Sequence, residues 1–332
     1  MAQKVDVLGL GNSLIDILAT ADDAFLSSQE MAKGAMTLID EDRADALYSL
    51  RQAPKIVSGG SAANTIVGVA SFGVSAAYIG KVKADELGQR FSDDLNATGV
   101  SYATAKAAHG PGTGRCFVYV TPEGERTMNT FLGASTYLSP DDVDEALVRA
   151  ARFVYLEGYM WDRPAAKAAF RKAGEIAHAA GARVALTLSD AFCVDRFRGE
   201  FIDLMRSGVV DTVFANSDEA RSLYQTPHLN EALDALAAEG VHAVVTRSEQ
   251  GSVIVEGEAR TEVPAHAIAR LIDTTGAGDL FAAGYLAGLA RGAEPVHCAR
   301  LAALEAAEVI QHLGARPEVS LKQMAATAGL AV

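Results

Sequence analysis

Short apolar segments alternate with longer stretches of helical periodicity along most of the chain. Such segments predict strands, and they lie at Val5–Leu10, Ala76–Ile79, Phe153–Leu156, Val184–Leu188, Thr212–Ala215 and Ala243–Thr246. Patterns typical of helices, such as Pro164–Ala180, separate most of them. Nearly continuous apolar strands between helices indicate a parallel sheet with helices on both faces. The pattern therefore predicts an α/β protein with a three-layer α/β/α core.

Two early stretches depart from this alternation. Ile17–Ala19 and Ala35–Ile39 have extended character and lie between the first strand and the first core helix. Gly114–Thr121 and Glu125–Phe131 predict a hairpin. Their alternation of apolar and polar residues suits a half-exposed sheet, so we expect a second, smaller sheet here.

The end of the chain also follows a recognisable pattern. Gly251–Glu256 and Arg260–Val263 predict a hairpin across Gly257-Glu258. Helical patterns follow at Leu280–Arg291, Pro295–His312 and Leu321–Ala328. The chain shows no long linker and no internal repeat.

Composition excludes some classes of protein. The 332 residues carry a net charge of −13, which argues against a protein that binds a nucleic-acid backbone. The three scattered cysteines give neither a disulfide framework nor a metal-ligand spacing. We find no signal peptide and no apolar run long enough to cross a membrane, so a cytoplasmic location without membrane partners is the expectation.

A glycine-rich turn opens the first of the C-terminal helical patterns. Asp273-Thr274-Thr275-Gly276-Ala277-Gly278-Asp279 precedes an apolar helix. A helix that starts at such a turn presents unpaired backbone N–H groups and binds anions. Asp279 would be an odd residue in a simple anion site, but a general base would explain it. A tight strand-to-helix turn with an acid in its first turn is the simpler alternative.

A second loop of the same kind lies far away in the sequence. Ser58-Gly59-Gly60-Ser61-Ala62-Ala63-Asn64 also leads into a helical pattern. The paired glycines Gly59 and Gly60 let a ligand approach the backbone closely. Asn64 lies about one turn into the helix, where asparagine is mildly unfavourable. Hydrogen bonding to a ligand would explain it, and so would exposure to solvent.

These loops resemble the signatures of the ribokinase-like (PfkB) family of sugar and nucleoside kinases. Gly59-Gly60-x-x-x-Asn64 is similar to the first signature of the family, together with Gly73, Gly80 and Asp85-x-x-Gly88 after it. Asp273–Phe281 is similar to the second signature. Asn216-Ser217-Asp218-Glu219 is similar to the Asn-x-x-Glu motif of the family. The resemblance runs from about Val5 to Gly314. It implies one ribokinase-like kinase domain over residues 1–332, with a small β lid from about 17–57 and 98–132.

Other nucleotide-binding motifs are incomplete. Gly9-Leu10-Gly11-Asn12-Ser13-Leu14 has the first two glycines of a dinucleotide fingerprint, but Leu14 stands where glycine or alanine is needed. Gly80-Lys81 is followed by Val82, so it is no P-loop. The seven histidines are dispersed, and no metal-binding spacing occurs.

The resemblance implies ATP-dependent phosphoryl transfer. Asp279 would be the general base, and Gly276, Ala277 and Gly278 would bind the transferred phosphate. Asn216 and Glu219 would organise Mg²⁺, through water. A helix cap with acids in the first turn is the alternative for this pair, and the segment can be both.

Further positions would bind the nucleotide and a cation. Thr246, Ser248 and Gly251 occupy the place of a nucleotide-binding turn, although Ser248 replaces the usual first glycine. Asp273 and Thr275 match positions that often help bind a monovalent cation, such as K⁺.

The acceptor site depends on the segment after the first strand. Asp16 is the candidate for accepting hydrogen bonds from two neighbouring ribose hydroxyls, supported by Asn12 and Asn64. The alternative is that Asp16 is an ordinary loop carboxylate. The form Gly-Asn-x-Leu-x-Asp-Ile is more similar to adenosine kinases than to ribokinases. An apolar slot for a base would come from Leu14, Met36, Cys116, Met128 and Tyr159, any of which could equally belong to the core of the lid. Arg126 resembles a lid arginine that closes over the phosphates in adenosine kinases, and an ordinary solvated arginine after a hairpin turn is the alternative.

The sequence therefore favours a kinase for the 5′-hydroxyl of a ribonucleoside, adenosine first. A kinase for a free pentose or hexose is the alternative within the family. A nucleoside-binding protein without catalysis is the alternative outside it. Monomer and homodimer both remain open, as do the preferred nucleobase and the phosphate donor.

Overall fold

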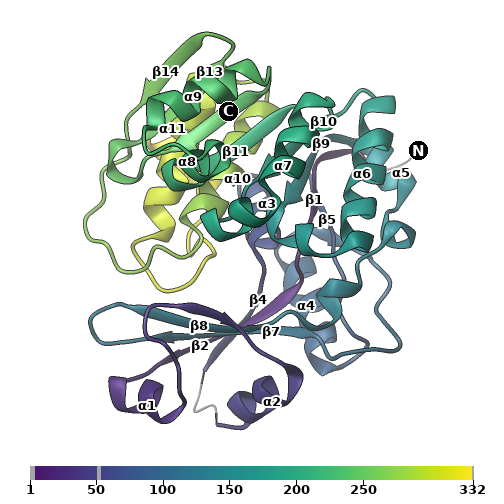
Figure 1. Cartoon of the computed structure of the whole chain (residues 1–332), viewed down its shortest axis with the longest axis vertical. Helices are drawn as coiled ribbons and strands as arrows, with labels where there is room; N and C mark the ends of the chain where they lie inside the picture. Colours follow the sequence, from purple (N-terminus) through teal and green to yellow (C-terminus); the bar gives the residue numbers. More distant parts are fainter. Residues whose placement is uncertain (1–3, 51–53, 331–332) are drawn as a thin grey trace.

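The computed structural model describes residues 4–50 and 54–330. Its large sheet has the order β14-β13-β12-β11-β10-β9-β1-β5-β6 and is parallel from β12 to β6 (Figure 1). The strands are β1 (Val5–Leu10), β5 (Ala76–Ile79), β6 (Ser101–Tyr102), β9 (Ala151–Glu157), β10 (Arg183–Thr187), β11 (Thr212–Asn216), β12 (His242–Thr246), β13 (Ser252–Glu256) and β14 (Ala259–Val263). The predicted parallel sheet and late hairpin are confirmed, since β13 and β14 pair antiparallel.

Helices cover both faces of this sheet. One apolar core contains residues of α3 (Ser61–Ser71), α4 (Glu86–Ala97), α10 (Ala277–Ala290), α11 (Pro295–Val309) and α12 (Leu321–Thr327). The other contains residues of α5 (Glu145–Ala150), α6 (Pro164–Ala179), α7 (Ala191–Arg206), α8 (Ser217–Tyr224) and α9 (Leu229–Ala238). Successive strand residues point to opposite faces, so Val7 joins the first core and Leu8 the second. The three-layer α/β/α core is confirmed.

A second sheet has the order β3-β8-β7-β2-β4 and lies beside the first one (Figure 1). Its strands are β2 (Leu14–Thr20), β3 (Met36–Leu38), β4 (Lys55–Gly59), β7 (Gly114–Val120) and β8 (Arg126–Phe131). Helices α1 (Asp23–Ser28) and α2 (Glu41–Ser49) lie on its outer side in Figure 1. We call these strands and helices the lid. Residues 101–102 belong to the large sheet, where β6 pairs with β5.

Exposure varies across the lid more than the alternation predicts. β7 is buried along its whole length, so the expectation of a half-exposed strand is wrong there. The reason is its place in the sheet, since β2 and β8 flank it and only the edge strand β3 is exposed at every residue. Alternate residues still point to opposite faces. Phe117 and Tyr119 pack with the core that contains Leu26 and Leu47, whereas Cys116 and Val118 form a separate cluster.

The lid and the large sheet are joined through very short segments. β1 ends at Leu10 and β2 begins at Leu14. β4 ends at Gly59, and α3 begins at Ser61. Both connections carry residues of the predicted acceptor site, so the fold brings that site to the boundary between the two sheets.

Candidate active site

Two helix N-termini define the site, one on α3 and one on α10. Gly60 precedes α3 with φ 107°, and Gly276 precedes α10 with φ 77°, a backbone region that strongly favours glycine. A Cβ atom on Gly60 would lie 2.1 Å from the carbonyl oxygen of Asn12. One on Gly276 would lie 2.7 Å from Cα of Ala315. Glycine is therefore required at both helix starts.

Asp279 connects the two helices. It lies in the first turn of α10 and accepts hydrogen bonds from Ser61 Oγ at 2.6 Å and from Asn64 Nδ2 at 3.2 Å, both on α3. Burial raises the pKa of Asp279 to about 6, and the bonds from Ser61 and Asn64 limit the rise. The carboxylate therefore titrates close to neutral pH, which suits a group that must take up and release a proton.

Asp16 lies on β2 and faces the same space. A Cβ atom on Gly59 would lie 2.2 Å from its carboxylate, so that glycine leaves room for Asp16. Burial raises the pKa of Asp16 to about 7, Arg316 lowers it, and the nearby charge of Asp279 raises it further. Asp16 is a strand residue here, not a residue of a free loop.

Asn12 is held entirely by other protein groups. Its Nδ2 donates to Glu157 Oε1, 2.5 Å away, and its Oδ1 accepts from Ser135 Oγ at 2.8 Å. Its backbone N–H donates to Glu157 Oε2 at 3.2 Å. The amide thus fixes the connection between β1 and β2.

Sequence reasoning missed Glu157, the buried carboxylate that holds Asn12. Glu157 ends β9, and its Oε2 also accepts from the backbone N–H of Ala62 at 2.9 Å, in the first turn of α3. Burial raises its pKa to about 7, and the hydrogen bonds from Ala62 and Asn12 oppose the rise. An acid at the carboxyl end of an apolar strand is a signal that could have revealed it, since ligand sites of α/β sheets lie at that edge.

Arg316 is the second residue that was missed. It belongs to residues 310–320 between α11 and α12, which we call the strap. Its Nε donates to Asn64 Oδ1 at 3.4 Å. Burial lowers the pKa of Arg316 to about 10, whereas the nearby charge of Asp16 raises it. No local sequence pattern marks this arginine.

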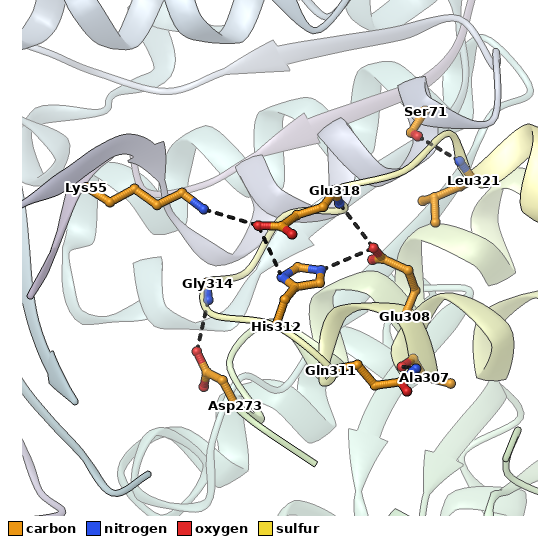
Figure 2. A network of polar contacts seen from close by, with 10 residues as sticks. All are labelled: Lys55, Ser71, Asp273, Ala307, Glu308, Gln311, His312, Gly314, Glu318 and Leu321. Atoms are coloured by element: carbon orange, nitrogen blue, oxygen red, sulfur yellow. Dashed lines mark hydrogen bonds and ion pairs between the residues drawn. The ribbon is translucent and has the colours of Figure 1, made fainter. Parts of the chain in front are cut away.

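The approach to α10 brings together Asp273, Thr275 and Arg126. Arg126 from β8 forms an ion pair with Asp273, with Nε and Oδ1 3.1 Å apart, and its guanidinium also donates to Thr274 and Thr275. Asp273 Oδ2 accepts from the backbone N–H of Gly314 in the strap at 3.0 Å (Figure 2). The lid arginine therefore meets the glycine-rich turn, where the sequence predicted a contact with phosphates.

Asn216 and Glu219 form the N-terminal cap of α8. Asn216 Oδ1 accepts from the backbone N–H of Glu219 at 2.8 Å, and Glu219 Oε2 accepts from that of Asn216 at 3.0 Å. Asn216 Nδ2 donates to Glu219 Oε1 at 2.6 Å. Burial raises the pKa of Glu219 to about 7. The cap, the simpler of the two interpretations, is thus present. The described part of the chain holds no group of three or more His, Cys, Asp or Glu side chains suited to a metal ion.

The predicted nucleotide turn lies at the end of the neighbouring strand. Thr246 pairs with Asn216 across β12 and β11, and its carbonyl oxygen accepts from Ser217 Oγ at 3.2 Å. Ser248 has φ 52°, so the serine keeps the left-handed conformation that the usual glycine would favour. Gly251 has φ 85° and approaches the carbonyl oxygen of Val263 closely.

The predicted base slot divides between the lid and the large sheet. Cys116 pairs with Asp16, and Met128 with Met36, while Asp16, Cys116 and Met128 share one face of the lid by register. Leu14 precedes Asp16 by two residues, on the same face. Tyr159 lies outside the lid, after β9, where its hydroxyl donates to the carbonyl oxygen of Ser189 at 3.2 Å.

Comparison with known proteins identifies the class of protein. Residues 35–321 match the pfkB family of carbohydrate kinases, and the chain belongs to that family. It is a phosphotransferase that acts on an alcohol group. Within the described residues, no helix is long and apolar enough to cross a membrane.

Particular relatives are nucleoside and sugar kinases. The adenosine kinase of Saccharomyces cerevisiae is 28% identical over 85% of this chain and 88% of its own length. The structure of adenosine kinase from Sinorhizobium meliloti is 49% identical with a TM-score of 0.92, covering 98% of this chain and 100% of that one. A probable sugar kinase from Rhizobium etli is 50% identical with a TM-score of 0.93, covering 98% of this chain and 99% of that one.

Proposed function

We propose that the protein transfers the γ-phosphate of ATP to the 5′-hydroxyl of a ribonucleoside, with adenosine as the first candidate. One observation carries the proposal. A half-buried carboxylate, Asp279, lies at the N-terminus of α10, is oriented by Ser61 and Asn64, and is close enough to Asp16 for their charges to interact. A base beside an anion site and a second carboxylate for ribose hydroxyls are the parts that this reaction needs.

The proposed chemistry uses few groups. The 5′-oxygen attacks the γ-phosphorus, the new O–P bond forms as the bond to the β-phosphate oxygen breaks, and the hydroxyl proton passes to Asp279. Backbone N–H groups of Gly276 and Gly278 stabilise the charge on the transferred phosphoryl group. The N–H of Ala277 donates to the carbonyl oxygen of Thr274 at 3.2 Å and would have to exchange that bond for one to the phosphate. Arg126 adds a positive charge at the same turn. Closure of the lid would exclude water, which competes for the phosphate.

A divalent ion would be organised by Asn216 and Glu219. Their oxygen atoms suit Mg²⁺, but each is engaged in the cap of α8, so binding through ordered water fits them better than direct coordination. The ion would neutralise charge on the phosphates. A monovalent cation at Asp273 and Thr275 would have to share Asp273 with Arg126.

The choice of nucleoside over free sugar rests on the lid and on the relatives. Cys116 and Met128 give the lid face beside Asp16 an apolar character, which suits a nucleobase next to a bound ribose. The similar protein from Sinorhizobium meliloti is an adenosine kinase. The equally similar protein from Rhizobium etli is called a probable sugar kinase, and this keeps a sugar acceptor as the second candidate.

A screen of acceptors tests the substrate. The purified protein with ATP and Mg²⁺ is assayed for ADP formation with ribonucleosides, 2′-deoxyribonucleosides, ribose and hexoses. We expect the highest kcat/KM with adenosine and a lower one with 2′-deoxyadenosine, which gives Asp16 one hydroxyl fewer. Turnover of a free sugar without turnover of any nucleoside would reject the nucleoside proposal.

A substitution tests the base. Asp279→Asn is expected to lower kcat by about 10²–10⁴-fold, the usual contribution of a general base, while adenosine binding in calorimetry persists. Asp203→Asn, at an exposed position on α7, is the matched control and should retain wild-type activity. A protein that binds nucleosides without catalysis would show no turnover before either substitution.

A further inference from the structure

The strap is fixed at several points around Arg316. The backbone N–H of Gly314 donates to Asp273, that of Glu318 to Glu308 Oε1 at 3.1 Å, and that of Leu321, just after the strap, to Ser71 Oγ at 3.2 Å. Figure 2 shows these bonds on either side of the imidazole of His312. The backbone that carries Arg316 is therefore tied to α10's approach, to α11 and to α3.

Arg316 has a donor that no described protein group satisfies. Its Nε donates to Asn64, but Nη2 is buried and has no hydrogen-bond partner. No carboxylate of a described residue lies within ion-pairing distance of Arg316, although Asp16 and Asp94 are near enough to act on its charge. Leaving a charged donor buried and unpaired is costly. The strap thus holds a buried donor, Nη2 of Arg316, that lowers stability while it is unpaired and that a ligand could pair with.

We propose that Arg316 is a substrate-positioning residue, whose Nη2 donates a hydrogen bond to an oxygen of the phosphoryl acceptor held between Asp16 and Asp279. This inference deepens the proposed function and rests on its placement of the acceptor beside Asp16 and Asp279. It does not depend on whether that acceptor is a nucleoside or a free sugar.

The charges define the chemical class of this acceptor. Asp16 interacts with the charges of both Asp279 and Arg316, two carboxylates and one guanidinium, so a phosphate-bearing acceptor held among them would meet net repulsion. An uncharged hydroxyl can donate to Asp16 and accept from Arg316 at once. The site therefore favours a neutral sugar ring with neighbouring hydroxyls.

Arg316 also acts through Asn64. The amide oxygen of Asn64 accepts from Arg316, and its nitrogen donates to Asp279. If the amide were flipped, its N–H₂ group would face the guanidinium of Arg316 and its oxygen would face the carboxylate of Asp279. Both contacts would be repulsive. Arg316 thereby keeps the N–H₂ group of Asn64 directed at Asp279, and this hydrogen bond helps Asp279 remain ionised.

The test compares Arg316→Met, which removes the charge, with Arg316→Lys, which keeps it. Arg300→Met, at an exposed position on α11, is the control. We expect kcat/KM for the acceptor to fall about 10- to 100-fold in Arg316→Met, the effect of losing a hydrogen bond to a charged group. KM for ATP should stay near the wild-type value. Arg316→Lys should retain more activity than Arg316→Met.

Two further readouts separate positioning from a structural role. In Arg316→Met the acid limb of kcat/KM against pH should move to higher pH, since Asp16 loses the neighbouring positive charge that lowers its pKa and still faces Asp279. Asp94 and Tyr78 also act on the charge of Arg316. In Arg316→Ala, guanidinium chloride below denaturing concentrations should restore part of the activity by filling the vacated space. Restoration by guanidinium but not by sodium chloride supports the proposal.

Other outcomes would overturn it. An unchanged kcat/KM in Arg316→Met would show that Nη2 does not contact the acceptor. Losses that follow the thermal unfolding midpoints of the three variants, without rescue and without a pH shift, would show a purely structural role. The acceptor used is whichever the wild-type protein phosphorylates best, so a failed nucleoside screen leaves this test intact.

Discussion

The N-termini of α3 and α10 look alike in sequence and are used in different ways. Both follow a glycine in the left-handed region and both meet at Asp279. At α3, the carboxylate of Glu157 already accepts from the backbone N–H of Ala62. At α10, among the described residues, the backbone N–H groups of Gly278 and Asp279 donate to no protein group, and nothing lies within 4 Å of a Cβ atom placed on Gly278.

The difference suits a site that has to bind two chemically distinct molecules, as the proposed function requires. A helix N-terminus with a carboxylate from the protein has a resident anion, so α3 mainly orients neutral groups such as the side chains of Ser61 and Asn64. An open helix N-terminus attracts an anion from solution, so α10 suits the phosphates of a nucleotide. Asp279 lies where the two helices meet, between the proposed positions of the acceptor and the phosphate.

The largest expected effect comes from giving α10 a resident anion of its own. Gly278→Glu places a carboxylate where the phosphate is proposed to bind, and the position has room for a side chain and an ordinary backbone conformation. Repulsion of about 4 kcal/mol at 4 Å and an effective dielectric constant of about 20 predicts a loss of roughly 10³-fold in kcat/KM for ATP.

Gly278→Gln is the neutral control for this substitution, because it adds nearly the same volume without charge. It should lose much less activity than Gly278→Glu, and acceptor binding should persist in both variants. Equal losses would mean that bulk, and not charge, matters at the N-terminus of α10.

The next effect is the dependence of activity on pH. The pKa of Asp279 is raised to about 6, and only the ionised carboxylate can accept the proton of the acceptor hydroxyl. We expect kcat/KM to fall about tenfold for each pH unit below that pKa, and to level off above it. A profile that is flat between pH 5 and 8 would contradict the role of Asp279 as the base.

A smaller effect concerns the resident anion of α3. The pKa of Glu157 is raised in the folded state to about 7, above its ordinary value of 4.5, so the folded protein binds the proton more tightly than the unfolded chain. The stabilising contribution is present below about pH 4.5 and is lost as the pH rises through about 7. Glu157→Gln should remove this decline, which is on the order of 3 kcal/mol.

Urea unfolding at a series of pH values measures the effect, and Glu145→Gln, exposed on α5, is the control. The control should show the same pH dependence as the wild-type protein. A Glu157→Gln variant that declines as steeply as wild type would mean that burial does not raise the pKa of Glu157.

The smallest effect is expected where the strap meets the lid. Lys55 and Glu318 lie 3.5 Å apart and are about half exposed (Figure 2). Exposed ion pairs contribute roughly 0–1 kcal/mol, so Lys55→Met should change the free energy of unfolding by less than about 1 kcal/mol. A larger change, insensitive to salt, would show that this pair holds the lid against the strap.

The sequence predicted most of what depends on local patterns. Strand positions follow from apolar runs, and Asp279, Gly60 and Gly276 lie in motifs that are continuous along the chain. The exposure of β7 was predicted wrongly because burial depends on neighbouring strands, which alternation alone does not reveal. Glu157 and Arg316 were missed because each is a single charged residue whose partners, Asn12 and Asn64, lie far away in sequence.

The short connections between the lid and the large sheet have a consequence for protein engineering. The segment from Gly11 to Ser13 and the residue Gly60 are the two shortest connections between the lid and the large sheet, so a movement of the lid would change the backbone there. They also belong to the proposed acceptor site, so we expect substitutions there to alter lid movement together with affinity. A change of acceptor without loss of turnover is better sought at Cys116 or Met128, whose side chains face the site from inside the lid and lie outside these connections.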